Sequence, residues 1–260
     1  PAPTPTPTPT PLPSPGVYEG FGKVTQGAAG CLTSPTIYHV TTLADSGAGS
    51  FRDAVSQGCR HIVFDVGGTI NLTADIHIRS SYLTVDGSTA PSPGITFNHP
   101  TVNEGIAIIP NAASGPAHDI IVHHLRHIGP GGHGGESQDF WGLDGQDGEV
   151  YNIILDHITA SGSNDGIFDI WGRVHDVTVS WNLMTNTVTA MHLASPSFTD
   201  LQNNISVHHN VLARNGERQI KVKGNSFTDF VNNIVYGWGW TGCAGRGLTL
   251  DSDGAMDPTL

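Results

Sequence analysis

The segment NISVHHNVLA at 204–213 decides the fold, because four other segments repeat its pattern: DIIVHHLRHI (119–128), NIILDHITAS (152–161), DVTVSWNLMT (176–185) and DFVNNIVYGW (229–238). Each segment begins with Asp or Asn, continues with alternating apolar residues, and carries a polar residue where the chain must bend. Their starts are 33, 24, 28 and 25 residues apart. One strand signature in every repeat of roughly 20–30 residues is typical of a solenoid.

We therefore predict an all-β chain coiled as a parallel β-helix. A β-sandwich is less consistent with these spacings, because its turn signals recur every ~8–12 residues. In a stacked coil the apolar side chains line the interior, and we expect Asn182, Asn210 and Asn232 to hydrogen-bond along the stack. A helical period is nearly absent, apart from a short candidate at Gly49–Val55.

The charged residues are unevenly distributed. The formal net charge is −12, and the chain has only 11 Lys and Arg residues. Four of these, Arg214, Arg218, Lys221 and Lys223, lie within ten residues of one another. Either this cluster binds an anion, or it is a chance grouping on a solvated face. No broad basic surface accompanies it, so we do not expect nucleic acid as a partner.

The cysteines and histidines offer little support for a metal centre. The three cysteines are Cys31, Cys59 and Cys243, and an odd number leaves at least one thiol unpaired. Cys31 and Cys59 flank the first predicted strand–turn–helix segment and are candidates for a disulfide. No zinc-ligand spacing is present among the cysteines. Consecutive side chains of a strand point to opposite faces, so we expect no shared ion at the pairs 123–124 and 208–209.

Several blocks, in their order and spacing, resemble polysaccharide lyase family 1, the pectate lyases, from about Gly20 to Trp240. The most specific blocks are VHHLRHIGPGG (122–132), NIILDHITAS (152–161), DVTVSWNLM (176–184), VHHNVLARNGERQIKVKGN (207–225) and DFVNNIVYGWG (229–239). The resemblance implies a right-handed, single-stranded parallel β-helix with a short N-terminal cap helix. It also implies a secreted, extracellular and monomeric enzyme that cleaves polygalacturonate by calcium-dependent β-elimination to unsaturated products.

The resemblance also identifies candidate calcium ligands. Asp165 and Asp169 in SNDGIFDI match two acidic residues that ligate calcium in the family. A further ligand is expected from the preceding turn, where Asp139 and Asp144 in QDFWGLDG are both candidates. Ca²⁺ takes roughly six to eight hard oxygen ligands, which carboxylates supply. The alternative for each carboxylate is a turn residue that accepts hydrogen bonds from its own backbone.

Arg218 matches the family arginine proposed as the base that removes the proton from C5 of the sugar. An arginine is ordinarily always protonated, so this role requires nearby cations that disfavour its charge. The alternative is that Arg218 stays charged, stabilises the enolate and orients a water or hydroxide. Lys223 resembles the second cation of this segment, which holds a substrate carboxylate, and Lys221 is an additional candidate for substrate binding.

Two positions depart from the family pattern. Ile220 stands where the family usually has proline, two residues after the catalytic arginine. Thr189 stands where a substrate-binding lysine is expected. We expect this second change to weaken the binding of substrate carboxylates, unless Lys221 or His192 takes over the role.

The domain organisation follows from composition. Residues 1–15, PAPTPTPTPTPLPSP, are rich in Pro and Thr and predict an extended linker, and residues 16–260 form the predicted β-helix domain. The linker either joins an upstream module or is a disordered end. We expect no membrane partner, because the apolar runs are only long enough for strands.

Three other functions fit parts of the sequence. A polygalacturonase would hydrolyse the same polymer with paired carboxylates, and RQIK (218–221) and GGHGG (131–135) resemble hydrolase motifs but in the wrong order. A pectin lyase would act on the methyl-esterified polymer without calcium. A non-catalytic β-helix would only bind the polysaccharide, since fold alone does not imply activity.

Overall fold

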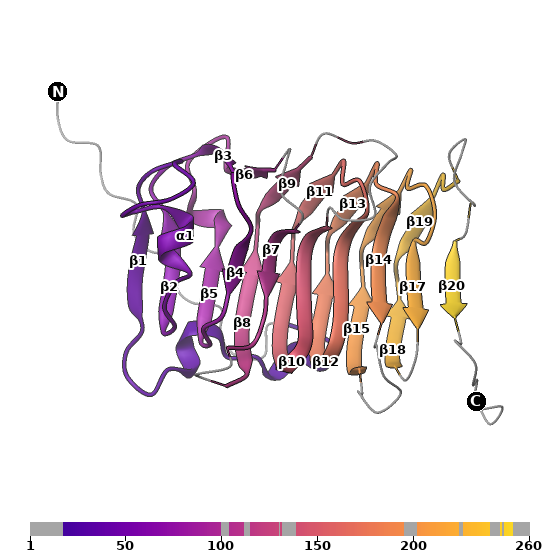
Figure 1. The fold of residues 1–260 in the computed structure, drawn as a ribbon, viewed down its shortest axis with the longest axis horizontal. Coiled ribbons are helices and arrows are strands. Elements are labelled where there is room, and N and C mark those ends of the chain that lie inside the picture. Colours follow the sequence, from indigo (N-terminus) through magenta and orange to yellow (C-terminus); the bar gives the residue numbers. More distant parts are fainter. Residues whose placement is uncertain are drawn as a thin grey trace.

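The computed structural model describes residues 18–99, 104–111, 115–129, 131, 139–194, 202–223, 226–239, 245 and 247–251. The predicted linker and Cys243 lie outside these residues. Within them the chain forms a parallel β-helix whose turns stack along one axis (Figure 1). This confirms the predicted fold class. No helix in the described part of the chain is long and apolar enough to cross a membrane.

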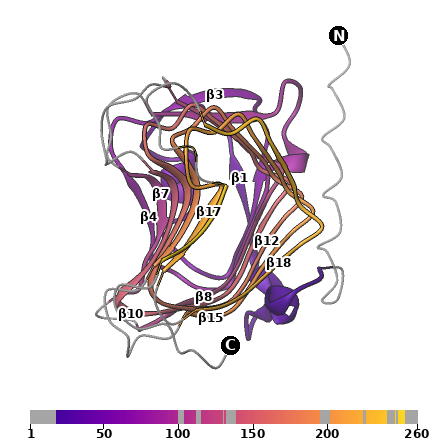
Figure 2. The same cartoon turned by 90° about the vertical axis from the view of Figure 1, so that its right-hand side faces the viewer.

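The coil has three faces, which enclose the core when viewed along the axis (Figure 2). Face 1 consists of β4 (Ile76–Ile78), β7 (Glu104–Ile108), the first parts of β10 (Asp139–Asp156) and β12 (Gly166–Ser180), then β14 (Thr189–Ala194), β17 (Ile220–Lys223) and β20 (Leu248–Asp251). Face 2 consists of β1 (Thr36–Val40), β2 (Arg60–Phe64), β5 (Leu83–Asp86), β8 (Ala117–His123), the last parts of β10 and β12, then β15 (Gln202–His208) and β18 (Ser226–Val231). Face 3 consists of β3 (Gly68–Asn71), β6 (Ile95–Asn98), β9 (Arg126–Ile128), β11 (Thr159–Ser161), β13 (Leu183–Thr185), β16 (Val211–Ala213) and β19 (Ile234–Tyr236).

The core is built from columns of apolar side chains that stack from turn to turn. On face 2, Val122, Leu155, Val179, Val207 and Phe230 are register partners on successive strands. The first four are fully buried. Because side chains alternate between the two faces of a strand, every second residue of each repeat points into the coil. The alternating apolar pattern of the repeats therefore supplies the core.

Each repeat bends between faces 2 and 3 at a residue with a positive φ, including His209 at 57° and Asn232 at 55°. The following residue supports the bend. Asn182 and Asn210 are buried and hydrogen-bonded to each other, and Asn233 continues the ladder by donating to the carbonyl of Val207 and accepting from Asn210. The prediction was correct for Asn182 and Asn210 but wrong for Asn232, which occupies the exposed bend position one residue earlier.

The N-terminal end of the core is covered by the expected short helix, α1 (Phe51–Ala54). Its N-cap residue, Ser50, accepts a hydrogen bond from the backbone N–H of Asp53. Phe51 is fully buried and packs against Phe64 and Phe97, with ring centroids 6.1 and 4.8 Å away. The other short helices are η1 (Phe21–Val24), η2 (Gly27–Gly30) and η3 (Gly87–Thr89).

Candidate functional site

Three of the four predicted calcium ligands line one pocket on the outer side of face 1. Asp139 and Asp144 come from β10, and Asp169 comes from the neighbouring strand β12. The pocket has a volume of about 260 Å³, and its remaining lining residues are Gly142, Leu143, Gln146 and Trp171. The structure therefore brings together carboxylates that are separated in sequence, and both alternatives for the ligand from the preceding turn lie in the same pocket.

The register of face 1 explains why the pocket opens beside Asp169. The register partner of Asp169 on β10 is Gly142, and its partner on β14 is His192. Gly142 has no side chain to fill the space on the outer surface next to the Asp169 carboxylate. A Cβ atom at Gly142 would meet only ordinary contacts with Ala107, so the glycine is not required by crowding in the backbone.

The carboxylates of the pocket also make local contacts. Oδ1 of Asp139 accepts a hydrogen bond of 2.7 Å from the backbone N–H of Gly166. Oδ1 of Asp144 accepts one of 2.9 Å from the backbone N–H of Gln146. Oδ1 of Asp169 lies 3.3 Å from Nδ1 of His192 but makes no hydrogen bond. The turn-residue alternative therefore applies in part to Asp144, whereas Asp139 connects two turns of the coil.

Asp165, the fourth predicted ligand, does not line the pocket. It lies immediately before β12, where its backbone N–H donates to Oγ of Ser163 and its carbonyl accepts from the backbone of Thr189. Its backbone therefore belongs to a turn rather than to the outer face of the strand.

The donor set of the pocket suits calcium better than softer metals. Carboxylate oxygens from Asp139, Asp144 and Asp169 are hard ligands, and Gln146 adds a further amide to the lining. These carboxylates do not form a group of three with ligand atoms within 4.8 Å of one another; among the described residues that criterion is met at Glu19, His208 and His209. An ion in the pocket would therefore draw further oxygen ligands from water or substrate.

Cationic side chains lie on the same outer face, two strands beyond Asp169. Lys221 on β17 is the register partner of His192, which is itself the partner of Asp169. Neighbouring strands are ~4.8 Å apart, so Lys221 begins about 10 Å from Asp169, across the sheet. Lys223 lies two residues after Lys221 on β17 and so points to the same face. Carboxylates and cations thus occupy one surface, with β14 between the strands that carry them.

Arg218 lies just before β17 with a positive φ of 46°. Its side chain is 34% exposed, and its Nε lies 3.6 Å from Oε2 of Glu217. Its carbonyl accepts a hydrogen bond from the backbone N–H of Ala190, which ties this segment to β14. Ile220, which stands in place of the family proline, points into the core and is 1% exposed.

Thr189 is 1% exposed, and its hydroxyl lies buried without a hydrogen bond. It therefore presents no group to a ligand at the surface. His192, three residues later, is partly exposed and packs near Trp171, with ring centroids 5.9 Å apart. His192 and Lys221 occupy the surface beside Asp169.

Sequence reasoning did not identify Trp171 and Gln146 as pocket residues. Trp171 follows Asp169 by two residues on the same strand, and residues two apart in a strand share a face. That spacing was available in the sequence. Gln146 was not recognisable, because it follows the register irregularity between Gly145 and Val150 that ends the first part of β10.

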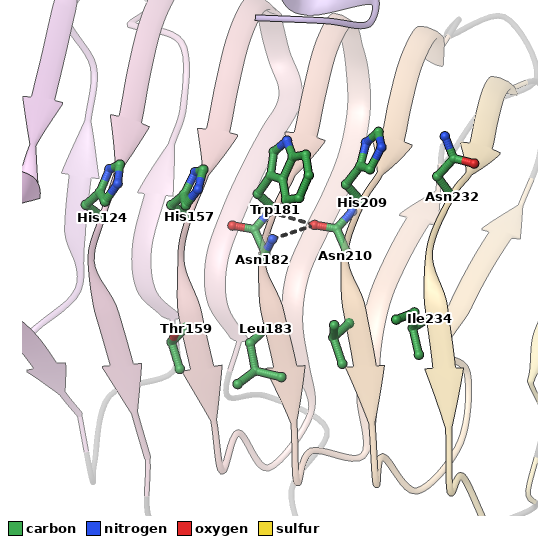
Figure 3. Close-up of a pocket in the computed structure, with 11 residues that line it drawn as sticks. His124, His157, Thr159, Trp181, Asn182, Leu183, His209, Asn210, Asn232 and Ile234 are labelled. Atoms are coloured by element: carbon green, nitrogen blue, oxygen red, sulfur yellow. Dashed lines mark hydrogen bonds between the residues drawn. The ribbon is translucent and has the colours of Figure 1, made fainter.

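A larger hollow of about 460 Å³ follows the bend between faces 2 and 3 (Figure 3). The rings of His124 and His157 are stacked 4.6 Å apart, and those of Trp181 and His209 are stacked 4.4 Å apart. The faces of these rings are therefore covered by one another, and their edges point outward. Among the described residues, its lining includes no Asp, Glu, Lys or Arg.

Comparisons with known proteins agree with the fold and with the resemblance to pectate lyases. The chain is 37% identical over 229 residues to a protein of Aspergillus oryzae described as "Probable pectate lyase C", a match that covers 86% of this chain and 48% of that protein. A protein of Neosartorya fischeri with the same description is 36% identical over 241 residues, covering 91% and 50%. The chain thus spans about half the length of these curated relatives.

The fold also matches a solved structure. The crystal structure of jun a 1, the major allergen from cedar pollen, superposes with a TM-score of 0.61 at 17% sequence identity and covers 92% of this chain and 76% of that one. At this identity the likeness concerns the fold alone. No family model matches the sequence.

Proposed function

Because this chain is a homologue of probable pectate lyases over most of its length, we propose that it cleaves α-1,4-polygalacturonate by calcium-dependent β-elimination. The observation that carries the proposal is the arrangement of Asp139, Asp144 and Asp169 in one pocket, with Lys221 on the same outer surface two strands away from Asp169. This surface offers ligands for a cation and cations for a polyanion side by side.

The reaction needs four contributions, one from a cation and three from the chain. Removal of the proton at C5 builds negative charge next to an ionised carboxylate, and the bond between C4 and the glycosidic oxygen then breaks to leave a C4–C5 double bond. A calcium ion held by the pocket carboxylates would neutralise the substrate carboxylate and so make the C5 proton more acidic. The chain itself must orient the polymer, stabilise the developing enolate and accept the proton.

Lys221 and Lys223 serve to orient the polymer. Their ammonium groups pair with successive carboxylates of the substrate, since both side chains leave the same face of β17. His192 lies between Asp169 and Lys221 and donates or accepts a hydrogen bond at the same surface. Together these residues supply the contact that a lysine at Thr189 makes in the resembling family.

We assign to Arg218 a direct role in removing the proton from C5 of the sugar. It precedes the strand that carries both lysines, and its backbone is tied to β14 through Ala190. A guanidinium ordinarily keeps its proton, so the role takes one of two forms. Either neighbouring cations disfavour its charge and it accepts the proton, or it remains charged, stabilises the enolate and orients a water or hydroxide.

The mass of the products separates lyase from hydrolase. Polygalacturonate is incubated with the protein and calcium, and the oligosaccharides are weighed by mass spectrometry. β-Elimination gives a fragment that is lighter by one water than the product of hydrolysis, so unsaturated oligogalacturonates support the proposal. Saturated fragments would support a polygalacturonase, activity restricted to methyl-esterified polymer without calcium would support a pectin lyase, and binding without cleavage would support a non-catalytic β-helix.

A further inference from the structure

The segment before β1 lies along the outer side of face 2, away from the strands β4, β7 and β17 of face 1 (Figure 2). We call residues 18–31 the N-terminal strap. It is held by hydrogen bonds from its backbone N–H groups to side chains of successive strands: Phe21 to Ser206, Gly22 to Thr178, Gln26 to Asp119 and Ala28 to Thr84. The strap therefore crosses the turns in the direction opposite to the growth of the coil.

The far end of the strap, at Cys31, is fixed covalently. Cys31 forms a disulfide with Cys59, the residue immediately before β2. This bond confirms the pairing that the sequence suggested. The near end, at residues 18 and 19, forms no disulfide among the described residues. There Glu19 lies over the junction of β12 and β15, because its carbonyl accepts a hydrogen bond from Oγ1 of Thr178.

Glu19 meets two histidines at this end. One ligand atom from each of Glu19, His208 and His209 lies within 4.8 Å of the others. The sequence led us to expect the two imidazoles on opposite faces of a strand, and this expectation was wrong. His208 is the last residue of β15, and His209 has a φ of 57°, so the bend turns both rings toward each other with their Nδ1 atoms 2.9 Å apart.

The imidazole of His208 has an unused polar atom. His208 is only 5% exposed, and its Nε2 is buried without a hydrogen-bond partner. If its Nδ1 donates to His209, this Nε2 is a buried lone pair; if it accepts, Nε2 carries a buried proton with no acceptor. Either state leaves a buried polar group unsatisfied, which is unfavourable, and coordination of a metal is one way to satisfy it.

His209 is held in position by its neighbour. Its ring stacks on the indole of Trp181 at 4.4 Å with an interplanar angle of 8° (Figure 3). This contact fixes the ring plane, so the orientation of its nitrogens requires little further ordering when a ligand binds. Glu19 itself is exposed, which gives a metal ion access from solvent.

We propose that Glu19, His208 and His209 form a binding site for a transition-metal ion, best suited to Zn²⁺, which tethers the near end of the strap to β15. Two imidazoles and one carboxylate are a donor set that zinc accepts, with a fourth position left for water. Calcium is disfavoured here because it prefers oxygen ligands. The site is independent of the calcium pocket and of the proposed lyase activity.

The chain contains a matched control. His123 and His124 repeat the geometry at an earlier turn, with their Nδ1 atoms 2.7 Å apart and rings at 80°, against 89° for the proposed pair. Within the described residues, this pair does not belong to a group of three potential ligands within 4.8 Å. His123 also has a carboxylate nearby, with Oδ1 of Asp86 3.6 Å from its Nε2, so the feature that distinguishes the proposed site is a carboxylate close to both imidazoles.

The test is a calorimetric titration of the metal-stripped full chain with Zn²⁺, for the unaltered protein and for Glu19→Gln, His124→Gln and Asp169→Asn. We expect one saturable site that Glu19→Gln weakens roughly tenfold or more, as loss of a direct ligand requires. His124→Gln and Asp169→Asn are expected to leave the Zn²⁺ affinity of this site unchanged. We also expect Zn²⁺ to raise the melting temperature of the unaltered protein but not that of Glu19→Gln.

Three results would overturn the proposal. The first is the absence of saturable Zn²⁺ binding to the unaltered chain. The second is equal affinity in the unaltered protein and in Glu19→Gln, which would mean that other histidines bind the ion. The third is a loss of Zn²⁺ affinity in His124→Gln that is as large as the loss in Glu19→Gln. Because Glu19 is exposed, its substitution is expected to leave the fold intact, and equal melting temperatures without metal check this.

Discussion

Asp169 and Gly142 define the pocket at the scale of single residues. The carboxylate lies opposite the glycine in the register of β10 and β12, so the space that a side chain would occupy remains open beside it. Asp139 and Asp144 reach the same space from the preceding turn. In the proposed reaction this is where the cation is held.

Asp169→Asn tests this assignment. The substitution keeps the shape of the side chain but removes its charge, so we expect the affinity for Ca²⁺ to fall on the order of tenfold or more, with a parallel loss of lyase activity. Calorimetric titration with Ca²⁺ measures the affinity. Asp65→Asn, on the loop after β2, serves as the control, because Asp65 pairs with His39 far from the pocket. Unchanged calcium affinity in Asp169→Asn would exclude the residue as a ligand.

Lys221 is expected to contribute to substrate binding rather than to the chemical step. Lys221→Ala removes a cation that faces the same surface as Asp169, so we expect KM for polygalacturonate to rise while kcat changes little. The effect is expected to shrink at high ionic strength, because exposed charges are screened. Lys23→Ala, on the exposed N-terminal strap, is the control for a general loss of positive charge. Equal increases of KM in Lys221→Ala and Lys23→Ala would contradict a specific role of Lys221 in substrate binding.

The candidate ligands came from the family resemblance, and the structure shows where each of them lies. Asp139, Asp144 and Asp169 were identified through the family resemblance, and the structure places them in one pocket. Asp165 stays a prediction: it does not line this pocket, and it lies one residue before β12 begins at Gly166. The position of its backbone in a turn depends on contacts with Ser163 and Thr189 that no local pattern reveals.

At the scale of elements, the bends are held by the Asn ladder. Asn210 is 1% exposed, accepts hydrogen bonds from the backbone and side chain of Asn182, and donates to Asn233 and to the carbonyl of Val179. The repeats predicted this ladder as far as Asn210. The segment DFVNNIVYGW has two consecutive asparagines, and only the position of the bend decides which of them enters the ladder.

Asn210→Ala is expected to destabilise the protein by about 2–4 kcal/mol, because it removes the side-chain partner of two backbone groups on the preceding turn, the N–H of Asn182 and the carbonyl of Val179. Asn232→Ala is the matched control. It removes an exposed asparagine from a bend position, where a change within about 0.5 kcal/mol is expected. Urea-induced unfolding of both variants measures the difference. Similar losses of unfolding free energy in the two variants would mean that the Asn ladder contributes little to stability.

At the scale of the whole molecule, buried histidines make stability depend on pH. His99 and His127 are fully buried, with Nδ1 of His99 2.6 Å from Nε2 of His127. Burial lowers the pKa of His99 to about 4, and burial together with the neighbouring His99 lowers the pKa of His127 well below its ordinary value. In the unfolded chain both titrate near ~6.5, so the unfolded state binds more protons below this pH.

Stability is therefore expected to fall as the pH drops from about 6.5 toward 4. Between pH 7 and pH 5 the expected loss is on the order of 1–2 kcal/mol for each histidine. Asp86 does not offset this trend: burial alone would raise the pKa of Asp86, but His61 and Ser88 lower it to about 2, so it stays ionised throughout the range. Urea unfolding at the two pH values measures the change. A free energy of unfolding that is equal or higher at pH 5 would contradict this account.

The repeats sufficed to predict the architecture, because a coil needs only one apolar strand pattern per turn and a residue that tolerates each bend. They did not predict that the chain before β1 returns along face 2. The strap has no strand pattern of its own, and its path is set by Ser206, Thr178 and Thr84, which follow it in sequence by more than fifty residues. Such contacts emerge only when the turns are stacked.

The central claim is that this surface performs calcium-dependent β-elimination, and the most direct test is the ultraviolet absorbance of the unsaturated product. Polygalacturonate is mixed with the protein in calcium, in the presence of a chelator, and with Arg218→Ala in place of the unaltered chain. We predict that absorbance rises with the unaltered protein in calcium and stays flat in the other two reactions. A rise that persists in chelator or in Arg218→Ala, or new reducing ends without any rise in absorbance, would contradict the account.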